Sequence, residues 1–318
     1  MDLAPTSGTD GSSRDPGPSS KLVRVNAPQT FWRGFIPTVK EIIACRELLG
    51  NLTRKELKVR YKDSTLGFFW SLLRPAFLLT IYYLVFGVIL KAQIYHFAIY
   101  MFSGLVAYDL FSNILGGSTS CIIYNSGLIK KVYFPREILP LAVIGSSLFH
   151  SSLQMGVLLL AEIIFGHAFI GFNLLLMPLA LVALVLFGTA LGLLLAAANV
   201  YLRDVQHLLE LVILFWFWTT PIVYSISLAE APLKRHQLFW LYLANPMTNI
   251  VIGFQRAFYG QAYTKVTDAK TGIVSRVAQV YTGNMVERLL VVCLVSSVFL
   301  WFAQRVFARA QGNFAQEL

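Results

Sequence analysis

The chain has 318 residues, of which 56% are hydrophobic and only 13% are charged, and its formal net charge at pH 7 is +10. In a water-soluble domain this composition would leave too little polar surface to cover the core, so it predicts a polytopic membrane protein. Basic residues beside apolar spans are an expected topogenic signal, and the positive charge therefore does not require a nucleic-acid partner. The cysteines Cys45, Cys121 and Cys293 show no CxxC spacing, which argues against a metal site or a disulfide.

The N-terminal residues 1–28 are rich in Ser, Gly, Pro, Asp and Thr and contain almost no large apolar side chains. Such a segment cannot bury enough surface to offset chain entropy, so we expect a disordered cytoplasmic tail. No apolar core of a secretory signal occurs before Ile42, and no cleaved leader is expected.

Residues 29–67 are predicted to be an amphipathic segment at the membrane interface. Between residues 38 and 62, apolar side chains recur at roughly helical spacing among several lysines and arginines. We expect a helix that lies on the membrane surface and bends at Gly50–Asn51. Two roles are open for it: a lipid-anchoring ramp, or a polar face that docks a cytoplasmic partner.

Residues 68–310 are predicted to form an all-α transmembrane domain with six helical spans. A helix needs about 20 mostly apolar residues to cross about 30 Å of hydrocarbon. Stretches of suitable length and composition occur at residues 71–90, 98–122, 138–165, 173–198, 208–227 and 286–307. Residues 311–318 then form a short cytoplasmic C-terminus.

A further apolar stretch, residues 236–255, is also long enough to cross the membrane. Asn245–Pro246 lies in its middle, and the residue before a proline is disfavoured in a helix. A break at mid-depth is tolerated only where protein covers the backbone or where it lines a cavity. We therefore expect residues 228–258 to be a re-entrant pair of short helices that returns to the outer face. The short loops place both termini in the cytoplasm, whereas the basic residues of the long loop, such as Lys265, would suit the cytoplasm if residues 236–255 crossed.

The sequence lacks the motifs of several enzyme classes. There is no GxxxxGK[ST] phosphate-binding loop, no DxD pair, no HExxH and no GxSxG, which argues against an ATPase, a glycosyltransferase or a protease within this chain. Energy for transport would then come from another subunit or from a gradient. A gradient-driven transporter typically has acidic residues in the membrane and an internal repeat; only Asp109, Glu162 and Glu210 lie within or beside predicted spans, and no repeat is visible.

Asp109 is the one carboxylate deep in a predicted span, where an ionised group is costly unless it faces water or a partner. Its role stays open between proton coupling, a hydrogen-bonded pair with Asn113, and a hydrated channel wall. His150 and Gln154 lie one helical turn apart on the third span. We expect them to satisfy each other or a neighbouring helix rather than to bind a metal.

Three motifs resemble those of permeases of polysaccharide-exporting ABC transporters, which carry O-antigen, teichoic acid and related glycans. The entry to the first span carries Arg60-Tyr61, Ser64, Leu66-Gly67, Trp70 and Pro75, with Phe86-Gly87 near its far end. The loop before the third span carries Lys131, Phe134-Pro135-Arg136-Glu137 and Pro140. The turn before the fifth span, residues 199–204, has the asparagine, aromatic residue and Arg-Asp pair of that family. One departure is Ala107-Tyr108-Asp109, where the family has a proline before an aromatic residue.

The resemblance implies the transmembrane subunit of an ABC exporter that moves a lipid-linked, O-antigen-like polysaccharide across the cytoplasmic (inner) membrane. It implies a homodimer with the channel at the subunit interface and two copies of a separate ATPase, which holds the ATP and Mg; this chain would have no cofactor and no enzymatic activity. The alternative functions are an ABC permease that exports a drug or a lipid, or a gradient-driven transporter. The residues hypothesised to couple to the ATPase are Arg54, Lys58, Arg60, Lys130, Lys131, Phe134, Arg136 and Glu137.

Two aromatic stripes are candidates for the channel wall. Trp216, Thr220 and Tyr224 recur at every fourth residue, and Tyr100, Tyr108 and Phe111 share one face of the second span. Aromatic rings stack on the C–H faces of sugars, which would suit a sliding polymer. The other interpretation is that these rings face lipid headgroups or pack between helices.

Overall fold

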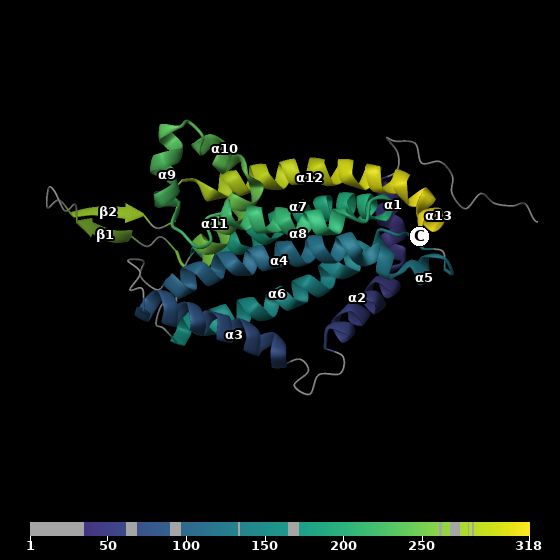
Figure 1. The fold of residues 1–318 in the computed structure, drawn as a ribbon, viewed down its shortest axis with the longest axis horizontal. Helices are drawn as coiled ribbons and strands as arrows, with labels where there is room; N and C mark the ends of the chain where they lie inside the picture. The colour runs from purple at the N-terminus through teal and green to yellow at the C-terminus, as the bar shows by residue number, and fades with distance from the viewer. Residues whose placement is uncertain are drawn as a thin grey trace, which may run out of the picture.

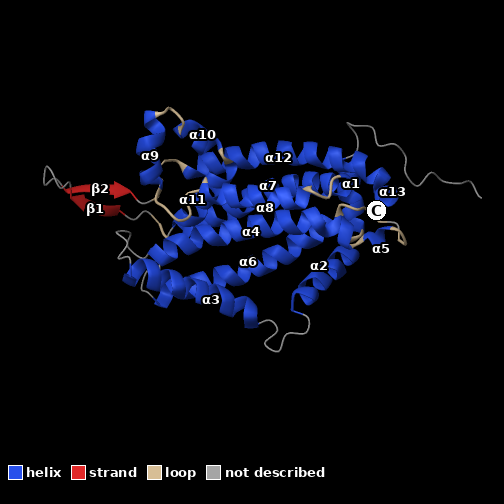
Figure 2. Cartoon of the chain, viewed as in Figure 1, coloured by secondary structure: helices blue, strands red, loops and turns tan. Residues whose placement is uncertain are grey.

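The structure is a computed structural model, and it describes residues 35–61, 69–89, 97–132, 134–164, 172–260, 263–267, 274–278, 280–281 and 283–318. The predicted tail at residues 1–28 lies outside the described residues. The described part of the chain is almost entirely helical, with one small sheet (Figure 2).

The N-terminal half contains α1 (Phe35–Ala44), α2 (Arg46–Tyr61), α3 (Trp70–Tyr82), α4 (Phe97–Tyr124), the short α5 (Ser126–Ile129) and α6 (Ile138–Ile164). A π-helical segment, Tyr83–Ile89, continues α3. The C-terminal half contains α7 (Leu176–Tyr201), α8 (Val205–Trp218), α9 (Ile226–Arg235), α10 (Phe239–Ala244), α11 (Pro246–Phe258), β1 (Tyr263–Thr267), β2 (Val274–Ala278), α12 (Met285–Ala310) and α13 (Phe314–Glu317).

Four helices in the described residues are long and apolar enough to cross a membrane: α4, α6, α12 and α7 with the turn before it, Asn173–Tyr201. Their bounds lie within three residues of the predicted second, third, fourth and sixth spans. The apolar helices in α3 and α8 are shorter, at 10–17 residues. The chain is therefore a multi-pass membrane protein, as its composition predicts.

The helix predicted at residues 208–227 ends early. It stops at Trp218, and the backbone turns through residues 219–225. Pro221 has no N–H to continue the helix, and the carbonyl of Phe217 accepts from the N–H of Thr220 at 3.2 Å. Thr220 Oγ1 donates to the carbonyl of Trp216 at 2.8 Å. Thr220 and Tyr224 are consequently not on one helical face with Trp216, and the predicted stripe on a continuous fifth helix is wrong.

The break at Asn245–Pro246 is confirmed. Asn245 has an extended backbone (φ −64°, ψ 118°), and its side chain caps α11 by accepting from the N–H of Met247 at 3.1 Å. The predicted bend at Gly50–Asn51 is wrong, because α2 runs through both residues and the discontinuity lies at Cys45. A single exposed glycine costs a helix only about 1 kcal/mol. The packing of α2 on α6 opposes that cost.

The hairpin of β1 and β2 was not predicted from the sequence. The strands pair antiparallel, with Tyr263 opposite Ala278 and Thr267 opposite Val274. Both strands contain β-branched residues, which are enriched in strands: Thr264, Val266 and Thr267 in β1, and Val274 and Val277 in β2. From the sequence alone, this segment is expected to be part of a long outer loop, because of the predicted break at Asn245–Pro246 and the family resemblance.

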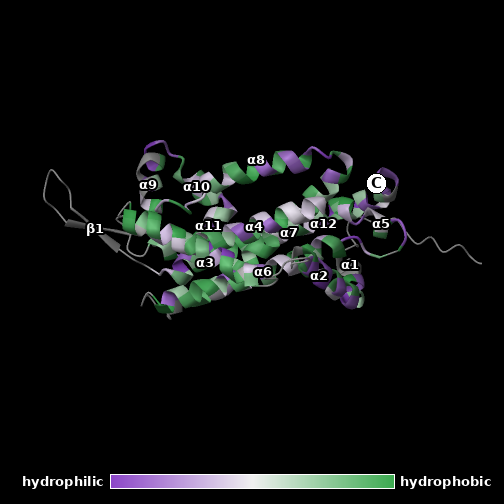
Figure 3. Cartoon of the chain, turned by 60° about the horizontal axis from the view of Figure 1, so that its bottom comes forward, coloured by the Kyte–Doolittle hydropathy of each residue, from purple (hydrophilic) through white to green (hydrophobic). Residues whose placement is uncertain are grey.

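The helices run lengthwise between two polar ends of the molecule (Figures 1 and 3). The elements α1, α2, α5 and α13 lie at one end with the C-terminus, which we call the α2 end. The elements α9, α10 and α11 lie with the hairpin at the other, the sheet end. Hydrophilic residues gather at these ends, and hydrophobic residues cover the helices between them (Figure 3).

Small residues allow α4 to pack closely against its neighbours in the centre of the bundle. A Cβ at Gly117 would lie 2.5 Å from Cγ1 of Val143 on α6, and one at Gly104 would lie 3.0 Å from Nε2 of Gln255 on α11. Close backbone approach through glycine is the usual way in which membrane helices gain van der Waals contact. This packing holds α11 within the bundle, where nearly all of its side chains are buried.

Candidate functional site

At the α2 end, α2 is fixed to the transmembrane helices by an apolar contact and a polar one. Leu52 is buried, and Thr53 packs against Gly145 of α6, where a Cβ would lie 3.1 Å from Thr53 Cγ2. Lys55 Nζ donates to Asn125 Oδ1 at 2.6 Å, just beyond the end of α4. The surface helix is therefore mechanically connected to α4 and α6.

The loop between α5 and α6 is anchored by the C-terminal helix. Phe134 is buried in a cluster with Phe307 and Phe314, and the Cζ atom of Arg136 lies 5.8 Å from the ring centroid of Phe314. A π-face beside a guanidinium is a stabilising arrangement. This contact joins the loop to α13, far along the sequence.

Lys130 and Lys131 are exposed at the turn of the same loop, and Arg54 and Lys58 are exposed on α2. Arg60 lies in the last turn of α2, but its side chain is outside the described residues. The structure thus gathers the predicted coupling residues at one end and divides them into two kinds. Phe134, Arg136 and Glu137 hold the loop in place, and the lysines extend from it.

Glu137 lies at the base of this loop with only 3% of its surface exposed. Burial raises the pKa of its carboxyl above the usual value, and the charge of Glu41 raises it further. A hydrogen bond from Gln311 Nε2 to Glu137 Oε1 at 3.3 Å and the charge of Arg136 oppose that shift. The net effect is a raised pKa, so the Glu137 carboxyl binds its proton more tightly in the folded protein than in the unfolded chain.

Replacing Glu137 with Gln should stabilise the protein most at neutral pH. The wild-type side chain binds its proton more readily when folded, so the wild type regains stability as pH falls from the raised pKa toward about 4.5, the unfolded value. The glutamine side chain does not titrate. The variant should therefore be more stable than the wild type by about 1.4 kcal/mol per unit of pKa shift at neutral pH, and this difference should shrink in acid. Thermal unfolding in detergent between pH 7.5 and 4.5 measures the gap, with the exposed Glu317→Gln as control. A gap that widens in acid would contradict this assignment.

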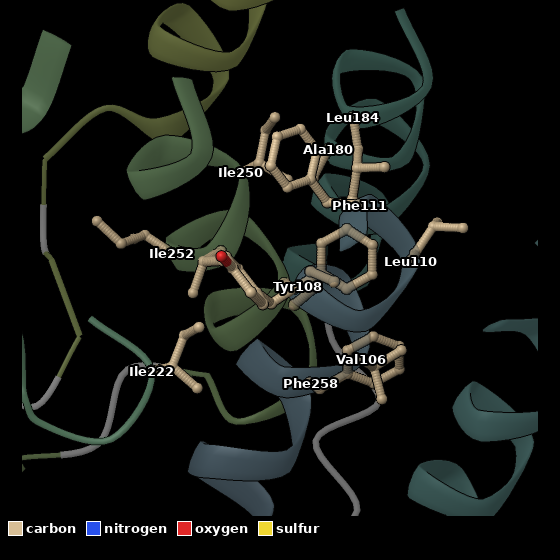
Figure 4. Close-up of a cluster of buried hydrophobic side chains, with 14 of the residues drawn as sticks. Val106, Tyr108, Leu110, Phe111, Ala180, Leu184, Ile222, Ile250, Ile252 and Phe258 are labelled. Atoms are coloured by element: carbon tan, nitrogen blue, oxygen red, sulfur yellow. The ribbon is translucent and has the colours of Figure 1, made fainter. Parts of the chain in front are cut away.

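Nearer the sheet end, the predicted aromatic residues form one cluster inside the subunit. The ring of Phe111 stacks with Phe187 at a centroid distance of 5.8 Å and meets Trp216 edge-on at 5.2 Å. The Tyr108 hydroxyl donates to the carbonyl of Ile213 on α8. Figure 4 shows Tyr108 and Phe111 among apolar side chains of α7 and α11. The cluster connects α4 with α7, α8 and α11.

Hydrogen bonds hold the rings of this cluster at the two irregular parts of the backbone. Trp216 Nε1 donates to Asn245 Oδ1 at 3.1 Å, the same atom that caps α11. The Tyr100 hydroxyl donates to the carbonyl of Tyr224 at 2.9 Å, and it also lies 3.3 Å from the carbonyl oxygen of Pro221. The carbonyls of Pro221 and Tyr224, in the turn after α8, therefore have a partner in the described core.

Burial differs among the predicted channel residues. Tyr100, Phe111 and Thr220 have no exposed surface in the single subunit and Tyr108 has 5%, whereas Trp216 and Tyr224 are half-buried. The buried members pack between helices within one chain. That these residues line the transport path stays a prediction. Trp216 and Tyr224 retain exposed surface that a ligand could contact.

Asp109 meets two polar residues of α6. Gln154 Nε2 donates to Asp109 Oδ2 at 2.9 Å, and His150 Nε2 lies 4.0 Å from the same oxygen. The expectation that His150 and Gln154 satisfy a neighbouring helix is confirmed. Asn113 also pairs with Asp109, since its Nδ2 donates to the backbone carbonyl of Asp109 at 2.7 Å. Helical spacing alone could not reveal the contact between α4 and α6.

The sequence is similar to one protein family and to several named proteins. The family model described as ABC-2 type transporter matches residues 47–259. The chain is 31% identical over 284 residues to an O-antigen export system permease protein RfbA of Myxococcus xanthus, covering 89% of this chain and 100% of the relative. It is 27% identical over 212 residues to a protein of the same name from Klebsiella pneumoniae, covering 67% of this chain and 80% of the relative. It is 26% identical over 205 residues to the polysialic acid transport protein KpsM of Escherichia coli, covering 62% of this chain and 75% of that relative.

The matched segment begins in α2 and ends after α11, so it contains both the anchored loop at the α2 end and the aromatic cluster. It covers more than half of the chain, and the Myxococcus relative is matched over its full length. The resemblance drawn from short motifs is thus confirmed over most of the sequence. The chain belongs to the ABC-2 type transporter family.

Proposed function

We propose that this chain is the membrane-spanning subunit of an ABC exporter that moves a lipid-linked, O-antigen-like polysaccharide outward across the cytoplasmic membrane. The observation that carries this proposal is the full-length similarity to a relative named as an O-antigen export permease. ATP hydrolysis on a separate subunit supplies the energy. The anchored loop of residues 130–137 and helix α2 form the surface on which that ATPase docks.

Depletion of the protein in its cell tests this function. Lipid-linked polysaccharide should accumulate in the cytoplasm-facing leaflet, and the surface polysaccharide should decline. A cell that loses a drug-resistance or lipid phenotype while its surface polysaccharide stays normal would instead support the drug or lipid permease.

The proposed topology has six spans with both termini in the cytoplasm. Helix α8 has 14 residues, about 21 Å at 1.5 Å per residue, so the turn at residues 219–225 completes that crossing. The segment α10–α11 enters from the sheet end and returns to it. Arg256 Nη1, near the end of α11, donates to the carbonyl of Gly283 at 2.6 Å, which supports a return to the level where α12 begins.

Cysteine labelling tests the re-entrant segment. In a background without the native cysteines, Arg235→Cys before α10 and Lys265→Cys in β1 should react with an impermeant maleimide from the same, outer side. Asn313→Cys beyond α12 should react only from the cytoplasmic side. Reaction of residues 235 and 265 from opposite sides would mean that residues 236–255 cross, and the six-span topology would be rejected.

A path wide enough for polysaccharide requires two copies of this chain in our proposal. The core residues of α4 are buried against α6, α7 and α11, so the described bundle is filled with side chains. Channels formed between subunits avoid opening such a core. A homodimer with a path between the copies and two ATPase subunits at the α2 end accommodates the polymer.

A further inference from the structure

A cavity of about 430 Å³ lies at the sheet end, between the break that separates α10 from α11 and the first turns of α12. Its wall is polar near the start of α12, with Tyr281, Glu287 and Arg288. It becomes apolar deeper along the helix, with Val291 and Val295. Such a wall fits a ligand that has a polar end and a hydrocarbon end.

Arg288 provides a cationic group at the polar end. Its Cζ atom lies 4.9 Å from the ring centroid of Tyr281, and its Nη2 donates to the Tyr281 hydroxyl at 3.0 Å. Within the described residues, the ion pairs are those of His150 with Asp109 and of Lys234 with Glu230. No carboxylate of these residues therefore lies within 4.0 Å of the Arg288 guanidinium. The N-terminus of the 26-residue α12 adds positive potential. Both features favour an anionic group, and arginine suits phosphate in particular.

Asn249 lines the same cavity. Its side chain is 3% exposed, and its Nδ2 donates to the carbonyls of Leu243 at 2.6 Å and Asn245 at 3.1 Å. Its Oδ1 is buried and has no hydrogen-bond partner within the described part of the chain. A buried acceptor without a partner is costly, so a ligand that carries an N–H or O–H donor would be stabilised there.

The apolar end of the cavity is formed by residues on the exposed face of α12. Val291 is 57% exposed and Val295 is 53% exposed, beside the exposed Leu294 and Val298. In a membrane protein such a face meets hydrocarbon, and a sugar placed against it would lose hydration without gaining polar partners. A lipid chain fits this wall, and a polysaccharide unit does not.

We propose that this cavity binds a bilayer phospholipid whose headgroup carries a hydrogen-bond donor, such as phosphatidylethanolamine. The phosphate binds Arg288, the ammonium group donates to Asn249 Oδ1, and one acyl chain lies along Val291 and Val295. A choline headgroup offers the same phosphate but no N–H or O–H donor. The site therefore distinguishes these two lipids, and it requires only that the chain be in a membrane, whatever substrate it exports.

Native mass spectrometry of the intact protein tests the site, with phosphatidylethanolamine and phosphatidylcholine of identical acyl chains added in turn to the detergent. We expect roughly tenfold stronger retention of phosphatidylethanolamine, corresponding to one charge-assisted hydrogen bond. Arg288→Gln should weaken retention of both lipids roughly tenfold, and Arg288→Lys should largely restore it. Val295→Phe should fill the apolar end and lower retention of both lipids.

The matched control is Leu294→Phe, which adds the same ring to the exposed face of α12 outside the cavity wall and should leave retention unchanged. Equal retention of the two lipids would overturn the proposal. So would wild-type retention in Arg288→Gln, or equal losses in Leu294→Phe and Val295→Phe, which would indicate lipid bound around the whole protein surface.

Discussion

Changing Lys130 and Lys131 together to glutamate should reduce polysaccharide export at least roughly tenfold while the protein stays folded and inserted. Both side chains are exposed at the α2 end, on a loop that Phe134 and Glu137 anchor to the core. Like charges placed across an interface cost several kcal/mol, more than the 1.4 kcal/mol that a tenfold change requires. The loss should arise from weakened coupling to the ATPase.

Export is measured as surface polysaccharide, and coupling as the amount of ATPase that co-purifies with the variant. The matched control is the double change of Lys234 and Arg235 to glutamate, which alters the net charge equally at the sheet end. That control breaks the exposed pair of Lys234 with Glu230 and the contact of Lys234 Nζ with the Phe239 ring, 5.5 Å from its centroid, and both contribute little at an exposed site. Normal export in the loop variant, or an equal loss in the control, would contradict docking at residues 130–137.

Replacing Tyr108 and Trp216 together with leucine should lower both thermal stability and export. The change removes four ring contacts, made with Phe111, Phe187 and Phe217. It also removes the donors to Ile213 and Asn245, which connect α8 to α4 and to the α10–α11 break. Hydrogen bonds between membrane helices contribute about 0.6 kcal/mol on average and up to about 1.7 kcal/mol. Lost ring packing adds to this, so we expect a total of roughly 2–5 kcal/mol.

The double change to phenylalanine is the matched control, because it keeps an aromatic ring at each position while it removes both donors. It should lose roughly 1–2 kcal/mol, which places its melting temperature between those of the wild type and the leucine variant. Loss of export in the leucine variant at an unchanged melting temperature would place these rings on the polysaccharide path. Wild-type stability and export in both variants would contradict any role for the cluster.

The positions of four spans could be predicted because the length of an apolar run directly limits where a helix crosses a membrane. The fifth span shows where this argument fails. Thr219, Thr220 and Pro221 lie between apolar neighbours, so hydropathy continues while the helix ends at Trp218. The break at Asn245–Pro246 was predictable, since a proline in a span-length segment has a local steric effect.

The site was predictable in location but not in the role of each residue. The motif around Phe134 and Glu137 identified the loop, yet nothing nearby in sequence shows that both side chains are buried. Their partners are Phe314 and Gln311, the latter 174 residues away from Glu137. The contact of Asp109 with Gln154 likewise could not be predicted from the sequence, because it depends on how α4 and α6 face each other.

Transport in sealed vesicles tests the central claim most directly. Inverted membrane vesicles that contain this chain and its ATPase expose the α2 end to the medium under the proposed topology. ATP added outside should move lipid-linked polysaccharide from the outer leaflet to the lumen, where an added glycosidase cannot reach it, and the Lys130 and Lys131 reversal should prevent this. Protection that appears without ATP, or no protection with a folded permease and an active ATPase, would contradict the assignment of this chain as a polysaccharide export permease.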